Sequence, residues 1–167
     1  MRRADKLEIE RRYLVAMPSQ EVLEGAERSE IKQTYLVSEA GCTERVRSRS
    51  STGGTIYTHT VKRRLGGIKR EEVEEEISAE EYARLFERAD KSRRTIEKTR
   101  CCLGYCGQVL EIDIFPFWDD RAIMEIELHN EEQTVYLPEF ISIIREISTD
   151  KRYTNASIAL QIPQEHI

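Results

Sequence analysis

The sequence lacks the features that define membrane and secreted proteins. Nowhere in its 167 residues is there an apolar stretch of about 18 residues, the length that a membrane-spanning helix needs. The N-terminal segment MRRADKLEIERR contains no apolar region of the kind that a signal peptide carries. We therefore expect a cytoplasmic protein that does not bind membranes.

Cysteine is also scarce, and three of the four cysteines cluster in the segment CCLGYC, at Cys101, Cys102 and Cys106. Such a cluster can contribute to a zinc site, but zinc sites usually bring a second paired ligand group, and Cys42 is the one cysteine left. Without a secretory signal, disulfides are not expected either. The pattern favours reduced, structural thiols.

A large excess of one charge is missing as well. The chain has 26 basic and 31 acidic residues, so its net charge of -5 is a small difference between two large populations. Nucleic acids and membrane surfaces favour partners with charge of one sign. We therefore expect no nucleic-acid partner, and the many charges must have another use.

Linkers rich in proline or glycine, internal repeats and low-complexity tracts are absent, which predicts a single domain over residues 1–167. Alternation of apolar and polar residues instead predicts β-strands. The predicted strands cover residues 7–16, 30–37, 43–50, 55–63, 69–77, 94–102, 108–115 and 122–129. The hairpin signals SSTGGT, LGG and LGYCGQ join neighbouring strands in an antiparallel meander.

Helical signals are few. The segment 78–90 has a serine N-cap and an acidic first turn, the segment 19–26 is short, and the segment 137–147 has a proline near its start. Each of the three is predicted to be a helix beside the sheet. After them, the tail 150–163 reads as a loop followed by a short apolar segment that packs back on the fold.

Charged side chains are sorted by strand. Residues i and i+2 share one face of a strand, so the face opposite the apolar residues can be read directly. The charges on this face are Glu8, Glu10 and Arg12 in the first strand, Arg45, Arg47 and Arg49 in the third, Lys62 and Arg64 in the fourth, Arg70, Glu72, Glu74 and Glu76 in the fifth, Lys98 and Arg100 in the sixth, Glu111 and Asp113 in the seventh, and Glu125 and Glu127 in the eighth.

A solvent-exposed face is the simplest interpretation of each strand alone. Taken together, same-sign clusters on so many strands need counter-ions, because like charges that near each other are unfavourable. If the strands close into a barrel, the charged face can line a channel with its apolar face covered from outside. Acids on one wall suit Mg²⁺ or Mn²⁺, and Arg and Lys on another suit phosphoryl oxygens.

At this point a family resemblance can be stated. Ordered blocks along nearly the whole chain resemble the CYTH superfamily, the triphosphate tunnel metalloenzymes. The blocks are EIERRYLV, KQTYL, RVRSR, YTHTVK, REEVEEEI, EKTR, LEID, MEIEL and DKRYTN. The resemblance implies a mainly β (α+β) fold, a closed eight-stranded antiparallel barrel with a few peripheral helices, in which a divalent metal and a triphosphate are bound. The family signature is Glu-x-Glu-x-Lys, and Arg12 stands here in place of the lysine.

The resemblance also implies roles for the charged residues. Glu8, Glu10, Glu125 and Glu127 are expected to ligate Mg²⁺ or Mn²⁺. Arg45, Arg47, Lys62 and Arg100 are expected to hold the phosphates, with Arg12, Arg49 and Lys98 as further candidates. Glu72 and Glu74 are expected to act with them in catalysis, and Glu111 and Asp113 to support the basic side chains. For Tyr35 and Tyr153, which fall in matching blocks, substrate contact and plain packing are equally expected.

The function implied is metal-dependent hydrolysis of a triphosphate, most of all inorganic tripolyphosphate, because no aromatic or glycine-rich site for a nucleobase is evident. Three alternatives stay open. The same residues would serve a class IV adenylate cyclase or a thiamine triphosphatase, and Arg12 leaves room for a binder of polyphosphate without catalysis. A homodimer is compatible with the sequence, through the outer apolar face or the CCLGYC hairpin, but no feature requires it.

Overall fold

The computed structural model describes residues 3–167, with side chains from residue 7 onward. Within this range the chain forms nine strands, three α-helices and one 3₁₀ helix. The strands are β1 Arg3–Ala16, β2 Glu27–Leu36, β3 Cys42–Ser51, β4 Gly54–Gly66, β5 Lys69–Ile77, β6 Ile96–Tyr105, β7 Gln108–Ile114, β8 Arg121–Glu127 and β9 Ile143–Glu146. The helices are α1 Gln20–Glu24, α2 Ala79–Phe86, η1 Lys151–Tyr153 and α3 Asn155–Leu160.

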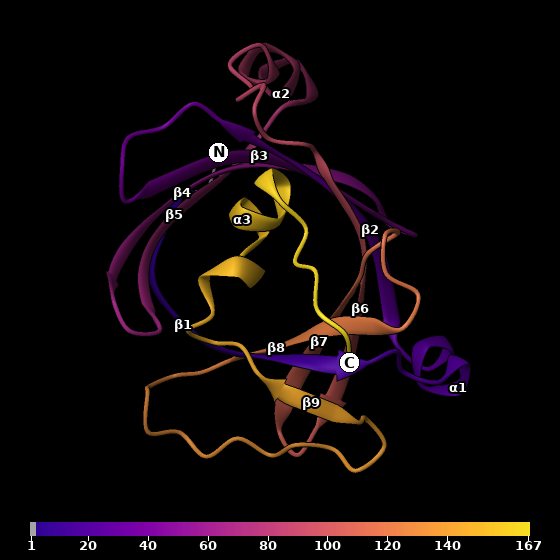
Figure 1. Cartoon of the computed structure of the whole chain (residues 1–167). Helices are drawn as coiled ribbons and strands as arrows, with labels where there is room; N and C mark the ends of the chain where they lie inside the picture. Colours follow the sequence, from indigo (N-terminus) through magenta and orange to yellow (C-terminus); the bar gives the residue numbers. More distant parts are fainter. Residues whose placement is uncertain (1–2) are drawn as a thin grey trace.

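The first eight strands close into an antiparallel barrel, seen end-on in Figure 1. The sheet order is β5-β4-β3-β2-β6-β7-β8-β1, and β1 closes the ring by pairing with β5. Residues 3–9 of β1 pair with β5, and residues 10–16 pair with β8. A ninth strand, β9, adds to β1 at residues 13–15. The predicted eight-stranded antiparallel barrel is therefore confirmed.

The outer, apolar face of the barrel is covered from outside, as the sequence predicted. Ile9, Ile112, Met124 and Ile126 are almost fully buried in one outer core, which the segment leading into β9 covers with Ile141. A second outer core contains Val46, Ile77 and Leu85, of which Leu85 comes from α2. Figure 1 shows α1 and α2 outside the ring of strands. Because the apolar side chains are buried on the outside, the opposite face of each strand points to the interior of the barrel.

One end of the interior is filled by the C-terminal segment. Leu14 and Ile123 lie on the inward face of their strands, and Phe115 directly follows β7. All three are almost fully buried in one core with Tyr153 and Ile158. Figure 1 shows α3 within the ring of strands. We call residues 147–160 the C-terminal plug. The tail packs back on the fold as predicted, and it does so inside the barrel, but η1 and α3 occupy most of the predicted loop.

The predicted helix over 137–147 is wrong, because this segment contains β9. In β1, residues 13–15 extend beyond the part that pairs with β5 and leave a free edge there, which β9 occupies. Ile141 enters an outer core while Ile147 enters the core of the C-terminal plug. Long-range pairing and burial on two sides outweigh the local helical signal. Across residues 3–167, no helix combines the length and the hydrophobicity needed to cross a membrane.

Candidate active site

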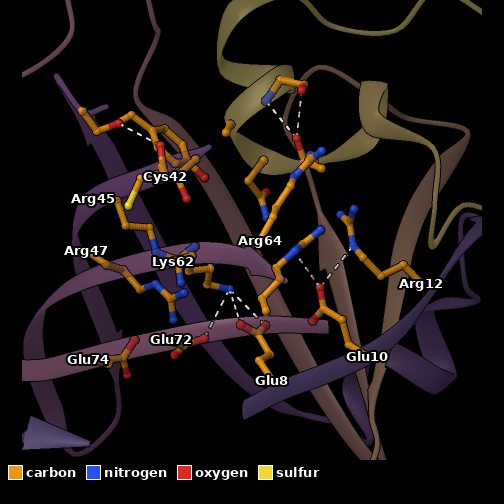
Figure 2. Close-up of a pocket in the computed structure, with 18 of the residues that line it drawn as sticks. Glu8, Glu10, Arg12, Cys42, Arg45, Arg47, Lys62, Arg64, Glu72 and Glu74 are labelled. Carbon is orange, nitrogen blue, oxygen red and sulfur yellow. Dashed lines mark hydrogen bonds and ion pairs between the residues drawn. The ribbon is translucent and has the colours of Figure 1, made fainter. Parts of the chain in front are cut away.

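Beside the C-terminal plug, the barrel interior contains a cavity of about 570 Å³ (Figure 2). The inward faces of the strands bring most of the predicted site residues to its wall. These are Glu8, Glu10, Arg12, Arg45, Arg47, Lys62, Glu72, Glu74, Lys98, Arg100, Glu111, Glu125 and Glu127. Two predicted residues do not line it: Arg49 donates to the Ser29 hydroxyl at 2.9 Å, and Asp113 lies behind the wall.

One wall carries a lysine between two carboxylates. Lys62 Nζ lies 2.8 Å from Glu8 Oε2 and 3.4 Å from Glu72 Oε2 (Figure 2). Burial opposes the charge on Glu8, but a hydrogen bond from Glu72 and the charge of Lys62 hold its pKa well below the usual range. Burial, together with that hydrogen bond, raises the pKa of Glu72 to about 7. Lys62 is thus already partly neutralised by its neighbours.

A group of crowded carboxylates faces this wall. Glu10 is opposite Glu127 in the register of β1 and β8, and the next inward pair is Arg12 with Glu125. Burial, with the charges of Glu125 and Glu8, raises the pKa of Glu10 to about 7. Crowding of this kind is relieved by a cation, and carboxylate oxygens are the ligands that Mg²⁺ and Mn²⁺ prefer. The donor set fits a divalent metal.

Basic side chains of the protein determine where several of these carboxylates point. Within residues 3–167, no three His, Cys, Asp or Glu side chains converge tightly enough to form a ready metal site. Glu8 is turned to Lys62, and Glu125 accepts from Arg12 at 3.1 Å and from Arg100 at 3.2 Å. Burial opposes the charge on Glu125, but Arg12 and Arg100 keep its pKa well below normal. The four predicted metal ligands therefore share one cavity without a common focus.

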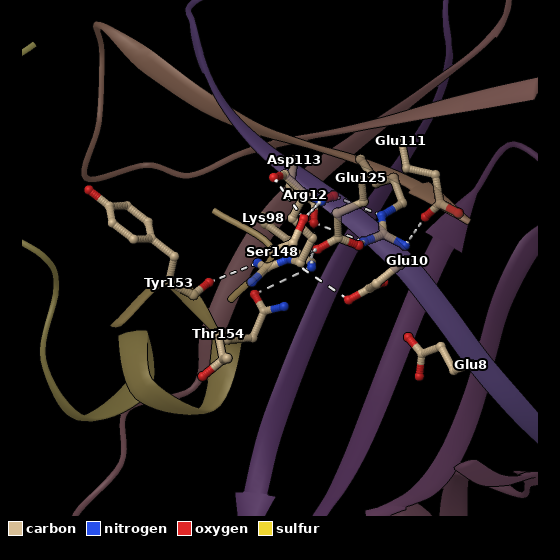
Figure 3. Close-up of polar contacts among 12 residues, drawn as sticks. Glu8, Glu10, Arg12, Lys98, Glu111, Asp113, Glu125, Ser148, Tyr153 and Thr154 are labelled. Atoms are coloured by element: carbon tan, nitrogen blue, oxygen red, sulfur yellow. Dashed lines mark hydrogen bonds and ion pairs between the residues drawn. The ribbon is translucent and has the colours of Figure 1, made fainter. Parts of the chain in front are cut away.

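Arg100 is held in a fixed orientation by acids on β7. Its Nε and Nη2 atoms donate to Asp113 at 2.7 and 2.8 Å, and its Nη1 donates to Glu111. Lys98 Nζ also contacts Asp113, at 2.6 Å, and burial lowers the pKa of Lys98 to about 8 in spite of this partner. Figure 3 shows Asp113, Lys98 and Glu125 gathered around these contacts. Asp113 and Glu111 thus contact the basic side chains, and their supporting role stays a prediction.

Arg45 and Arg47 differ from Arg12, Lys62, Lys98 and Arg100 because no ion pair joins either to a carboxylate in the described part of the chain. The Nε atom of each is buried and has no hydrogen-bond partner. Arg45 has a single side-chain contact in the hydrogen-bond set, a 3.5 Å donation to Gln33. Burial and the charges of Arg45 and Arg100 lower the pKa of Arg47 to about 10. Two neighbouring guanidinium groups whose buried Nε atoms lack acceptors make this part of the wall a candidate anion site.

Arg12 faces the C-terminal plug. Its Nη2 atom donates to the backbone carbonyl of Tyr153 at 2.8 Å while Nε donates to Glu125 (Figure 3). The backbone N–H of Arg12 also donates to the Ser148 hydroxyl at 2.9 Å. The guanidinium therefore joins the carboxylate wall to the plug. Tyr153 itself is fully buried, and its ring packs in the core of the plug.

Several lining residues have no role in the sequence-based interpretation. Arg64 and Arg70 lie on the inward faces of β4 and β5, Arg93 follows α2, and the segments 38–43 and 154–157 complete the wall. The alternation of β4 and β5 already places Arg64 and Arg70 on the charged face, so this signal could have found them. Apart from residue 43, which begins a predicted strand, the two segments lie outside the eight predicted strands, and their positions depend on tertiary packing.

Fold and site together define a class: closed antiparallel barrels whose interior holds crowded carboxylates beside unpaired guanidinium groups. Comparison with known proteins identifies the family within this class. A CYTH domain model matches residues 6–159, and the chain belongs to the CYTH domain family. The resemblance read from the ordered sequence blocks is thereby confirmed.

Individual relatives agree with this assignment. An inorganic triphosphatase of Nitrosomonas europaea is 33% identical over 161 residues, which cover 93% of this chain and 99% of the relative. A solved structure of an inorganic triphosphatase is similar with a TM-score of 0.61 and 29% identity, over 94% of this chain and 97% of that one. A protein of Pyrococcus horikoshii with 22% identity shares the fold, with a TM-score of 0.55 over 74% of this chain and 80% of its own.

Proposed function

We propose that this chain hydrolyses inorganic tripolyphosphate to pyrophosphate and orthophosphate, with Mg²⁺ or Mn²⁺ as cofactor. The observation that carries the proposal is the pair Arg45 and Arg47, whose buried Nε atoms have no acceptor. Burying a charge without a partner is costly, so such a pair is expected only where an anion binds. Guanidinium groups bind phosphoryl oxygens in a bidentate manner, which suits a phosphate chain.

The crowded carboxylates supply the cation side of the proposal. Glu10, Glu125 and Glu127, with Glu8 beside them, would hold the metal, and the raised pKa of Glu10 is the observation in favour. A divalent cation held by these carboxylates would offset the negative charge that develops on the phosphate groups in the transition state. Lys62, which is paired with Glu8 in this structure, would add a further cation for the phosphates.

The remaining charged residues organise the site before the substrate arrives. Asp113 fixes the Arg100 guanidinium through two hydrogen bonds, so little reorientation is needed when phosphate binds. Residues 154–157 of the C-terminal plug close one side of the cavity. In the reaction, water attacks the terminal phosphorus, and the bond between this phosphorus and the bridging oxygen breaks. The products are orthophosphate and pyrophosphate.

Inorganic phosphate chains fit this cavity better than nucleotides. Tyr35 is the one aromatic residue among the lining residues that the structure describes. Its ring lies under the Arg93 guanidinium, 5.8 Å from ring centroid to Cζ, and its hydroxyl accepts from Gln33 at 3.1 Å. Because the ring is only 5% exposed, it offers no face on which a base could stack. The relationship to the inorganic triphosphatase of N. europaea supports the same choice.

A substrate panel tests the proposal. The purified chain is assayed with tripolyphosphate, pyrophosphate, ATP and thiamine triphosphate, each with Mg²⁺ and with Mn²⁺. We expect orthophosphate release to be fastest from tripolyphosphate, and Arg47→Gln to raise its KM at least about ten-fold, because a charge-assisted contact is lost. Arg63→Gln is the matched control, since Arg63 points outward to Glu71. Formation of cyclic AMP from ATP, without hydrolysis of tripolyphosphate, would refute the proposal.

A further inference from the structure

In the β4–β5 hairpin, several polar side chains directly opposite each other form hydrogen bonds or ion pairs. Thr60 donates to Glu74 at 2.8 Å, Lys62 is paired with Glu72, and outward-facing Arg63 is opposite Glu71 at 3.8 Å. At the next inward position two like charges meet instead, because Arg64 is directly opposite Arg70. Like charges directly across a ladder are destabilising unless an anion lies between them.

Neither arginine of this pair is neutralised by the protein to the extent that Lys62 is. No ion pair joins Arg64 to a carboxylate among residues 7–167, and its side chain is exposed. Arg70 has one such contact, 3.5 Å from Nη1 to Glu10 Oε1. Both side chains line the cavity (Figure 2 labels Arg64). The backbone N–H of Arg64 donates to the carbonyl of Gly41, in the exposed segment 38–41, at 3.4 Å, and Arg70 is directly opposite Arg64. The pair therefore marks the mouth of the cavity.

The mouth pair continues a row of cations that starts deep in the barrel. Arg47 is opposite Thr58, Arg45 is opposite Thr60, and Lys62 follows Thr60 on the inward face of β4. Arg64 comes next on this face, about 7 Å beyond Lys62 along the strand. A linear polyphosphate carries negative charges at regular intervals along its length, so its charges complement such a row of cations.

We propose that Arg64 and Arg70 form a second anion subsite at the mouth, which binds the outer end of linear inorganic polyphosphates of four or more phosphoryl groups. This deepens the proposed function and rests on it for the inner part of the chain. Arg93 is not part of the subsite, because it is held by Asp90 at 3.3 Å and by the backbone carbonyl of Ala156. With this subsite, the protein binds polyphosphates of four or more phosphoryl groups more tightly than tripolyphosphate.

The test compares tripolyphosphate with tetrapolyphosphate. Binding of each is measured by calorimetry in metal-free buffer, and hydrolysis is measured with Mg²⁺. For Arg64→Gln we expect the Kd and KM of tetrapolyphosphate to rise about ten-fold, with less than about three-fold change for tripolyphosphate and unchanged kcat. Arg70→Lys, which keeps the charge, should retain most of the affinity that Arg70→Gln loses.

Arg63→Gln is the control, because it removes the same charge from the neighbouring position on the outer face. Equal weakening of both ligands by Arg64→Gln, or equal weakening by Arg63→Gln, would overturn the subsite. The two proposals fail separately. Absence of hydrolysis by the unmodified chain would refute the proposed function, whereas the binding data would still show whether the mouth distinguishes four phosphoryl groups from three.

Discussion

At the scale of single residues, Arg12 shows how one substitution in a signature changes a contact. The family resemblance leads to the expectation of a lysine at this position. The Arg12 side chain, which is 3% exposed, instead donates both to Glu125 and to the carbonyl of Tyr153. A planar fork with several donors can make both contacts at once, whereas an ammonium on a flexible stem is a single point of charge. Arg12 is therefore a positioning residue between the carboxylate wall and the C-terminal plug.

Arg12→Lys is expected to lower the free energy of unfolding by about 1–2 kcal/mol, since at least one buried hydrogen bond is lost. Urea unfolding measures this change, and limited proteolysis shows whether the plug loosens. Arg12→Gln, which also removes the charge beside Glu125, should destabilise the chain further. If the lysine variant were as stable and as resistant to protease as the unmodified chain, the tether between wall and plug would not exist.

At the scale of elements, α3 matters through the side chains that it inserts into the barrel. Ile158 is fully buried against the inward residues of the strands, whereas Leu160, in the same helix, is 49% exposed. Ile158→Ala is expected to cost about 2–4 kcal/mol of stability because it leaves a cavity in the core of the plug. Leu160→Ala is the matched control and should change stability by less than about 1 kcal/mol. Equal thermal stability of the two variants would contradict the role assigned to α3.

Strand β9 and the C-terminal plug show which elements could not be predicted from the sequence. Alternation within a strand is local, so the inward charges of β1 and β8 could be predicted residue by residue. The segment 143–146 has an apolar pattern that fits a helix or a strand, and the free edge of β1 at Tyr13–Val15 decides between them. The plug depends likewise on contacts far apart in the sequence. Its position inside the barrel could not be inferred from residues 150–163 alone.

At the scale of the whole molecule, the sequence separates the two faces of the barrel but does not rank the residues on the charged face. Arg47 and Arg49 have the same parity in β3, yet the cavity reaches the first and not the second. Asp113 was predicted as a support and lies behind the wall, where it orients Arg100. Arg64 and Arg70 have the right parity too, and closure of the ring places them at the mouth. Depth along the barrel axis is set by strand stagger, which one sequence does not reveal.

The central claim is that the crowded carboxylates and the unpaired arginines act together on a triphosphate. The most direct test measures orthophosphate release from tripolyphosphate by the unmodified chain and by Glu10→Gln, with Mg²⁺, with Mn²⁺ and with a chelator. We expect release by the unmodified chain only when metal is present, and a loss of at least about 100-fold in Glu10→Gln, which removes the charge of a proposed metal ligand and keeps the size of the side chain. Metal-independent release, or full activity of Glu10→Gln, would contradict the account.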